Sequence, residues 1–157
     1  MMWRRLSLAA TVFILDQLTK LLAAHYLTYH AGIKVTSFFN LVMVHNSGAA
    51  FGFLSAASGW QNPLFIAIAS SACVFILWMT WRLDVKDRLL ANGLMLILGG
   101  AAGNLVDRLM HGYVIDFVDL YYRTHHWPAF NIADSAITIG AALLILDSLG
   151  FWKQRAR

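Results

Sequence analysis

The chain has 157 residues, of which 59% are hydrophobic and 13% charged, and its mean hydropathy is +0.61. Soluble domains carry about 25% charged residues, so this composition excludes an ordinary water-soluble protein. The formal charge of +4 would indicate nucleic acid only on a soluble body with a basic face, so we expect no nucleic-acid partner. With two prolines and no low-complexity run to form a linker, the sequence predicts a single membrane-embedded domain over residues 1–157.

Four apolar segments are each long enough to form a transmembrane helix, because a bilayer core of about 30 Å needs roughly 20 residues at about 1.5 Å per residue. The predicted fold class is therefore an all-α polytopic membrane protein with four transmembrane helices. The predicted spans are residues 6–22, 63–81, 89–106 and 132–152.

The first span contains Asp16, Gln17 and Lys20, which disfavours its interpretation as a cleaved secretory signal. Asp16 and Lys20 are four residues apart and share one face of a helix, where an ion pair lowers the cost of charge inside a membrane. A structural ion pair and a contact with a substrate both explain this pair.

The basic residues indicate how the spans are oriented. Eight of the twelve lysines and arginines lie in regions that an even number of spans places on one side, and by the positive-inside rule that side is cytoplasmic. We therefore expect both termini in the cytoplasm and two longer connections, 24–62 and 107–131, on the outer face. The eight residues are Arg4, Arg5, Arg82, Lys86, Arg88, Lys153, Arg155 and Arg157.

The two outer connections show different patterns. Residues 32–44 are rich in β-branched and aromatic side chains and partly alternate, which predicts a small extracytoplasmic β-sheet. Tyr113, Phe117 and Tyr121 recur every four residues, with Trp127 beyond, which predicts a short amphipathic helix at the membrane interface. Aromatic residues at that depth serve either as anchors or as a lid over a site.

The acidic residues narrow the possible chemistry, because all eight are aspartates. A zinc protease of the His-Glu-x-x-His kind needs a glutamate, and the six histidines show no compact ligand spacing, so we expect no metal site. The Gly-x-Ser-x-Gly pattern of a serine nucleophile does not occur, and Cys73 lies in mid-span away from any base. Carboxylate chemistry remains, with four aspartates at the outer ends of the spans: Asp107, Asp116, Asp119 and Asp134.

Two of these four aspartates, Asp116 and Asp134, have mainly apolar neighbours in the sequence. A charge in such surroundings is costly, so both are functional candidates, whereas Asp119 is the first we would assign to solvated loop charge. Two carboxylates held close together cannot both ionise easily. The ionised one can take a proton from an attacking water while the protonated one donates to the carbonyl oxygen.

Five motifs occur in order along the chain. They are Asp16-Gln-Leu-Thr-Lys20, Asn46-Ser-Gly-Ala-Ala-Phe51, Gly99-Gly-Ala-Ala-Gly-Asn-Leu-Val-Asp-Arg108, Val114-Ile-Asp-Phe117 and Phe130-Asn-Ile-Ala-Asp134. Each is weak alone, but together, on four spans, they make the chain resemble the bacterial lipoprotein signal peptidases (signal peptidase II) over nearly its whole length.

The resemblance implies a membrane aspartic endopeptidase with Asp116 and Asp134 as its catalytic pair. Its substrates would be diacylglyceryl-modified prolipoproteins, cut just before the lipid-modified cysteine, and no metal or organic cofactor is implied because carboxylates and water suffice. It would lie in the bacterial cytoplasmic (inner) membrane with a periplasmic active site, and we expect a monomer among membrane lipids. The site-supporting residues implied by the family pattern are Asn46, Gly48, Asn104, Asp107, Arg108, Asn131, Asp16 and Lys20.

Positions within the motifs indicate further roles. The side-chain amides of Asn46, Asn104 and Asn131 can both donate and accept hydrogen bonds, which suits them to orient the carboxylates of the catalytic pair. Arg108 cannot face its neighbour Asp107 on a helix, so its partner should lie elsewhere. Gly99 and Gly103 form a small-xxx-small pattern that favours close helix packing. The alternative from another class is a small transporter or proton-relay protein, because intramembrane Asp and Lys residues also mark ion pathways.

Overall fold

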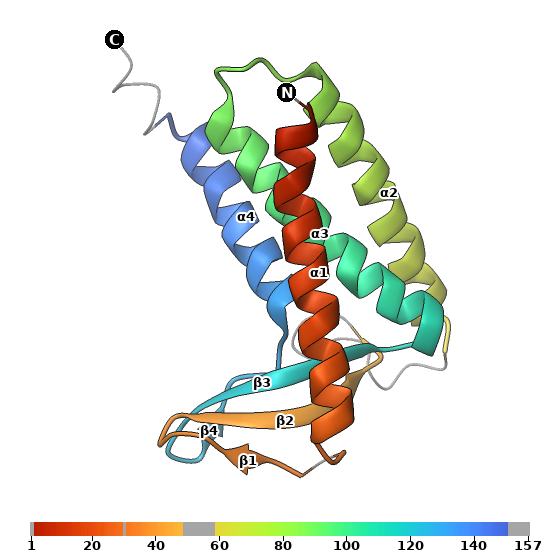
Figure 1. The fold of residues 1–157 in the computed structure, drawn as a ribbon, viewed down its shortest axis with the longest axis vertical. Helices are drawn as coiled ribbons and strands as arrows, with labels where there is room; N and C mark the ends of the chain where they lie inside the picture. The colour runs from red at the N-terminus through yellow and green to blue at the C-terminus, as the bar shows by residue number, and fades with distance from the viewer. Residues whose placement is uncertain (1, 30, 49–58, 151–157) are drawn as a thin grey trace.

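The computed structural model describes residues 2–29, 31–48 and 59–150, which form a helical bundle standing on a small antiparallel sheet (Figure 1). The motif residues 49–51 and the end of the predicted fourth span, 151–152, lie outside this part. The helices are α1 (Met2–Tyr26), α2 (Gln61–Arg82), α3 (Arg88–His111) and α4 (Ile132–Ser148). The strands are β1 (Ile33–Lys34), β2 (Phe39–Asn46), β3 (Val114–Tyr122) and β4 (His125–His126).

Each predicted span falls on one of these helices. Helices α1, α2 and α3 are long and apolar enough to cross a membrane, and the described part of α4 has 17 residues. The first helix is longer than its predicted span, from Met2 to Tyr26 instead of 6–22. Arg4 and Arg5 interrupt the apolar pattern, but arginine is a good helix former. The predicted span therefore begins later than the helix does.

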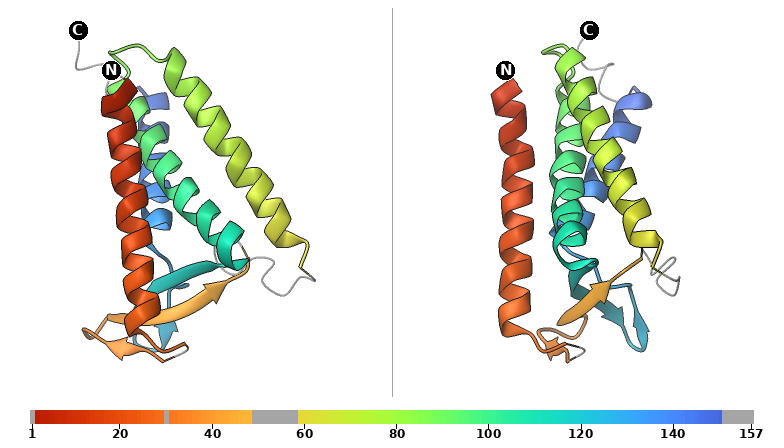
Figure 2. Two further views of the ribbon diagram at one scale, coloured as in Figure 1. Left: turned by 45° about the vertical axis from the view of Figure 1, so that its right-hand side comes forward. Right: turned by 90° about the vertical axis from the view of Figure 1, so that its right-hand side faces the viewer.

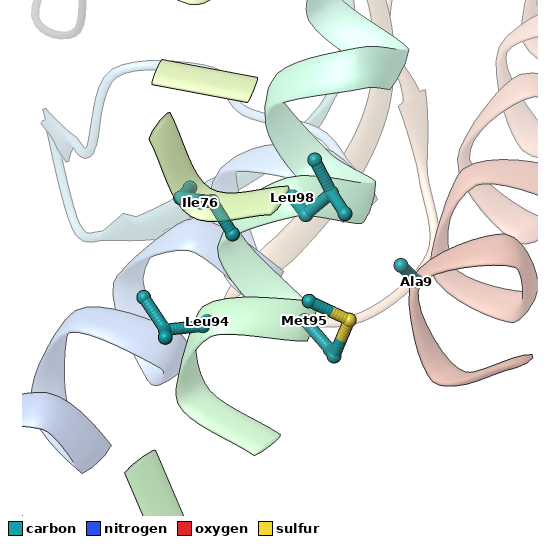
Figure 3. Packing of buried hydrophobic residues seen from close by; sticks show 5 residues of the cluster. All are labelled: Ala9, Ile76, Leu94, Met95 and Leu98. Atoms are coloured by element: carbon teal, nitrogen blue, oxygen red, sulfur yellow. The ribbon is translucent and has the colours of Figure 1, made fainter. Parts of the chain in front are cut away.

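Helix α3 lies at the centre of the bundle and contacts α1, α2 and α4. Ala9 of α1 and Ile76 of α2 meet three buried side chains of α3, Leu94, Met95 and Leu98 (Figure 3). Met95 is completely buried. The packing of α1 and α2 is therefore organised around this one helix.

Glycines let α1 and α4 approach α3 closely. A Cβ atom at Gly99 would lie 2.6 Å from the carbonyl oxygen of Ala9, and one at Gly100 would lie 2.5 Å from that of Ala133. A Cβ atom at Gly103 would meet the carboxylate of Asp16. The predicted packing role of Gly99 and Gly103 is confirmed, and it also brings charged residues of α1 against α3.

The sheet lies at the end of the bundle opposite the start of α1 and the end of α4 (Figures 1 and 2). Its strand order is β1-β2-β3-β4 and all pairings are antiparallel. Strand β2 pairs with β3 from Asn46↔Val114 to Phe39↔Leu120, with a shift in register between Leu41 and Val44. The predicted sheet is therefore present, and it extends into the second outer connection.

The predicted interfacial helix at 113–127 is wrong, because β3 occupies most of this segment. Tyr113, Phe117 and Tyr121 are four apart, but a spacing of four is also a multiple of two and places residues on one face of a strand as well as of a helix. The β-branched residues of the segment and the free edge of β2 favour the strand. The spacing of the aromatic residues alone could not distinguish a strand from a helix.

A left-handed glycine connects α3 to β3. Gly112 has φ 81° and its N–H donates to the carbonyl of Arg108 at 3.1 Å, which ends the helix. The strand begins two residues later, at Val114. This tight connection holds the end of α3 directly beside the start of β3, where the site is built.

Candidate active site

Asp134 is fixed at the amino end of α4 by a capping box. Asn131 is the N-cap residue, and its Oδ1 accepts a hydrogen bond from the N–H of Asp134 at 2.9 Å. In return, Oδ2 of Asp134 accepts from the N–H of Asn131 at 3.3 Å. Both groups satisfy N–H donors that a helix start leaves unpaired, so the carboxylate is held by local structure.

Asp116 is the third residue of β3, and its side chain is 1% exposed. Its Oδ1 accepts from Nδ2 of Asn131 at 2.7 Å, and its Oδ2 accepts from Nδ2 of Asn46, at the end of β2, at 3.0 Å. The strand pairing explains the first contact. Phe130 forms a bridge with Val118, so the next residue, Asn131, reaches back toward Asp116.

One side chain, that of Asn131, therefore binds both predicted catalytic residues. Its oxygen is occupied by the N–H of Asp134, so its NH2 group must face the carboxylate of Asp116. The amide orientation follows from the bonding pattern, and Asn131 is 0% exposed. The side chains of Asp116 and Asp134 thus share one buried hydrogen-bonding partner.

A second asparagine, Asn104 of α3, bonds to the other side of Asp134. Its Nδ2 donates to Oδ1 of Asp134 at 2.9 Å. Its own Oδ1 accepts from Nζ of Lys20 at 2.8 Å and from Nδ2 of Asn131 at 3.3 Å. The three predicted asparagines, including Asn46, thus all donate to the carboxylate pair.

Burial in this site raises the pKa of the Asp116 carboxyl from 3.8 to about 7, and the nearby negative charge of Asp134 acts in the same direction. Hydrogen bonds from Asn46 and Asn131 and the charge of Lys20 act against this rise. A carboxyl with this pKa holds its proton up to neutral pH, so it can serve as an acid there.

The predicted pair Asp16 and Lys20 forms a buried ion pair at 2.8 Å. Lys20 also lies 2.9 Å from Oδ2 of Asp107 on α3. Gln17 joins the same group, with its Nε2 2.9 Å from Oδ1 of Asp107. The amide of Gln17 was not among the expected site residues, although its position between Asp16 and Lys20 offered a signal.

Arg108 bonds away from its sequence neighbour Asp107, as expected. Its Nη2 donates to the carbonyl of Gly48 at 3.0 Å and its guanidinium lies over the ring of Phe65, 5.1 Å from its centroid. The N–H of Gly48 donates to Oδ1 of Asn46 at 3.0 Å. Gly48 thus contributes through its backbone, and Arg108 holds the segment that follows β2 against α3.

A cavity of about 510 Å³ opens beside Asp134, Asn104 and Arg108. Its remaining walls are largely apolar and come from the segment before α4 and from the first turns of α4. Sequence reasoning did not assign Ser135 and Thr138 to the site, although they lie one and four positions after Asp134 and so near it on the helix. The other lining residues are Asn46, Val114, Trp127, Pro128, Ala129, Phe130, Ser135, Thr138 and Ile139.

Asp119 lies three residues after Asp116 in β3 and has partners of its own. Its Oδ2 accepts from Nδ2 of Asn40 at 2.8 Å, and Nδ1 of His126 lies 2.9 Å from its Oδ1. Of the aspartates at the site, Asp134 lines the cavity, whereas neither Asp116 nor Asp119 does. The expectation that Asp119 is solvated loop charge is wrong, because its side chain is buried and paired.

Within the described residues, three apolar helices able to cross a membrane, a small antiparallel sheet and a cavity beside buried polar side chains define the class, a helical membrane protein with an internal polar site. The chain belongs to the signal peptidase (SPase) II family, whose sequence model matches residues 8–150. It is therefore a peptidase.

Individual relatives agree with this assignment. The chain is 52% identical over 144 residues to a lipoprotein signal peptidase of Alteromonas mediterranea, covering 92% of this chain and 79% of the relative. It is 46% identical over 155 residues to that of Acinetobacter baylyi, covering 99% and 86%. A solved structure described as "Bacterial membrane enzyme structure by the in meso method at 2.3 A resolution" matches with a TM-score of 0.83 at 31% identity, covering 93% of this chain and 87% of that one.

Proposed function

We propose that this chain is an aspartic endopeptidase that removes the signal peptide from diacylglyceryl-modified prolipoproteins, cutting just before the lipidated cysteine. Family membership supports the reaction. The observation that supports the catalytic pair is the single Asn131 side chain, which contacts Asp134 through its oxygen and Asp116 through its nitrogen at 2.9 and 2.7 Å. Two carboxyls held this way, with Asp134 lining a cavity and Asp116 buried next to it, are the groups that water-activated hydrolysis needs.

The two carboxyls have different surroundings, which favours different roles. Asp134 lines the cavity at the amino end of α4, where the helix dipole favours negative charge, so it is the group that takes a proton from the attacking water. Asp116 lies deeper and holds its proton up to about pH 7. It therefore donates to the carbonyl oxygen as negative charge develops there.

The substrate class and the topology belong to the same proposal. The helices, including α4 as a fourth span, cross the bacterial inner membrane with both chain ends cytoplasmic and the sheet and site periplasmic. A diacylated cysteine keeps its acyl chains in lipid, so a cavity with apolar walls at the membrane edge meets the scissile bond without extracting the anchor. The enzyme acts as a monomer.

The test of the reaction uses purified protein in detergent or lipid and a diacylglyceryl-modified prolipoprotein. Mass spectrometry should show a free signal peptide and a product that begins with the lipidated cysteine. Asp116→Asn and Asp134→Asn keep the size of each side chain but remove its ionisation, and each should abolish product formation. An intact substrate with the unaltered enzyme would contradict the peptidase assignment and favour a transporter or proton relay.

The topology has a separate test. Reporter fusions in the connection at 83–87 should report the cytoplasm, and fusions after Tyr122 should report the periplasm. The reverse pattern would place the cavity on the wrong side of the membrane for this substrate.

A further inference from the structure

A buried charged cluster lies behind the two carboxyls and does not line the cavity. It consists of Lys20 and Asp16 from α1 and Asp107 from α3, with side chains at most 4% exposed. Lys20 contacts both carboxylates, at 2.8 and 2.9 Å. One positive charge thus faces two negative charges, and the remaining negative charge must be stabilised by hydrogen-bond donors.

The Asp16 side of the cluster holds the backbone just before Asp134. Oδ2 of Asp16 contacts Lys20, and its Oδ1 accepts from the N–H of Ala133 at 2.9 Å. Ala133 is in the first turn of α4 and is 0% exposed. Asp16 therefore ties the start of α4 to α1 through the residue that precedes one catalytic aspartate.

Asp107 holds the backbone just before Asp116 in the same way. Oδ2 of Asp107 contacts Lys20 and also accepts from the N–H of Ile115 at 3.2 Å. Ile115 precedes Asp116 in β3. The cluster therefore holds both catalytic residues from behind, each by the N–H of the preceding residue, and one lysine joins the two attachments.

Lys20 makes a third contact, to Asn104, that also affects the surroundings of the catalytic pair. Its Nζ lies 2.8 Å from Oδ1 of Asn104, so the oxygen of this amide faces the lysine and its NH2 group faces Asp134. The lysine thus determines which end of Asn104 meets the carboxyl pair.

We propose that Lys20, Asp16 and Asp107 are positioning residues that set the distance between the two catalytic carboxyls through the backbone at Ala133 and Ile115. This inference rests on the proposed function. A charge cluster that only stabilised helix packing would contact side chains of the bundle. Besides side chains such as that of Asn104, this cluster accepts the two backbone N–H groups next to the reacting residues. Carboxyls that must share a proton are sensitive to small changes in separation.

The atoms of the cluster allow a matched comparison of two substitutions. Asp16 uses one oxygen for Lys20 and the other for Ala133, so Asp16→Asn, with a single acceptor oxygen, must lose one of these bonds. Asp107 uses one oxygen for both Lys20 and Ile115, so Asp107→Asn can keep both of these bonds and loses only the bond from the Gln17 side chain to its other oxygen. Each variant removes one negative charge from the same buried cluster.

We therefore expect unequal losses in kcat for cleavage of the diacylglyceryl-modified prolipoprotein. For Asp16→Asn, kcat should fall by about 30-fold or more, because a misplaced catalytic group costs roughly 100-fold per ångström. For Asp107→Asn, kcat should fall by only about threefold. KM should change by less than about twofold in both, since neither residue lines the cavity. Equal losses, or losses confined to KM, would overturn the proposal.

A second variant covers the case in which Asp16→Asn does not fold. Asp16→Glu keeps the charge and the ion pair with Lys20 but lengthens the side chain, which moves its carboxylate relative to Ala133. Its kcat should fall by about tenfold, and the separation between the two apparent pKa values in its pH–rate profile should change. An unchanged kcat and pH profile would show that only the charge matters and would reject the positioning role.

Two controls in the same assay separate the inference from the proposed function. Asp119→Asn replaces a buried, paired aspartate of β3 that has no contact with this cluster, and it should keep the pH profile and kcat of the unaltered enzyme. If Asp116→Asn retains full activity, the proposed function fails. If Asp116→Asn is inactive while Asp16→Asn and Asp107→Asn lose the same activity, only the positioning role fails.

Discussion

Strand β3 carries two buried aspartates, Asp116 and Asp119, each of which accepts a hydrogen bond from an asparagine of β2. Asp116 pairs with Asn46 at 3.0 Å, and Asp119 pairs with Asn40 at 2.8 Å. The residues are three apart on one strand, and both are less than 10% exposed. The same strand thus presents the same acid–amide pair twice.

Asp116 and Asp119 differ in their second hydrogen-bonding partner. Asp119 lies against the imidazole of His126, a group that can carry positive charge. Asp116 has the neutral amide of Asn131 instead, and its charged neighbour is another carboxylate, Asp134. A buried acid with a basic partner is suited to holding a sheet together. A buried acid with neutral hydrogen-bond donors and a like charge nearby keeps its proton near neutral pH, so it is suited to proton transfer.

The largest difference between Asp116 and Asp119 should appear in activity. We expect Asp116→Asn to lower kcat/KM for prolipoprotein cleavage by about a thousandfold or more, because the proton donor loses its acidity. Asp119→Asn should stay within about threefold. The measurement is initial rates of signal-peptide release at matched protein concentrations, and comparable losses in both variants would remove the functional distinction between the two aspartates.

The pH–rate profile should show the same contrast. With the pKa of Asp116 near 7, kcat/KM should fall above about pH 7, approaching tenfold per pH unit, as Asp116 loses its proton. The bond from Asn46 favours the ionised form, so Asn46→Ala should move this decline to higher pH. Asn40→Ala removes the corresponding bond to Asp119 and should leave the decline in place. A shift to lower pH in Asn46→Ala would contradict the assignment of this limb to Asp116.

Stability should also depend on pH through Asp116. Its pKa is about 7 in the folded protein and near 3.8 when exposed, so between these values the folded state binds more protons than the unfolded state. The free energy of unfolding should therefore decrease as pH rises from about 4 to 7, by an amount on the order of a few kcal/mol. Thermal unfolding in detergent should show this decrease, and Asp116→Asn should flatten it while Asp119→Asn should not. A rise in stability over this range that depends on Asp116 would reverse the predicted sign.

The smallest effect is expected at the outer end of the strand. The side chain of His126 is 53% exposed, so its ion pair with Asp119 is screened by solvent and is worth about 1 kcal/mol at most. His126→Ala should lower the Tm by roughly 4 °C or less and change activity by less than about twofold. A large loss of cleavage would show that this end of β3 also takes part in the reaction.

The sequence predicted the helices well and the sheet only in part. Long apolar segments determine where the four helices lie, because the requirement for about 20 apolar residues leaves few alternatives. The strand at Val114–Tyr122 was missed because its aromatic spacing fits both periods. Its identity depends on pairing with β2, which is distant in the chain.

The site was predictable at the level of residue type. Asp116 and Asp134 stood out because charge beside apolar neighbours is costly. The pattern could not show that Asn131 bonds to both, since the amide orientation depends on the capping box and on the Phe130–Val118 bridge. Nor could it show the role of Ala133, whose contribution is a backbone N–H that any residue except proline would supply.

The Asp16–Lys20 ion pair has a consequence for biosynthesis. Lys20 has three partners, but Asp107 and Asn104 belong to α3, which is translated much later than α1. Only Asp16, one turn away, is present when α1 first enters the bilayer. Helix α1 therefore carries the counterion of Lys20 itself, so Lys20 is not an unpaired charge in the lipid before α3 is inserted.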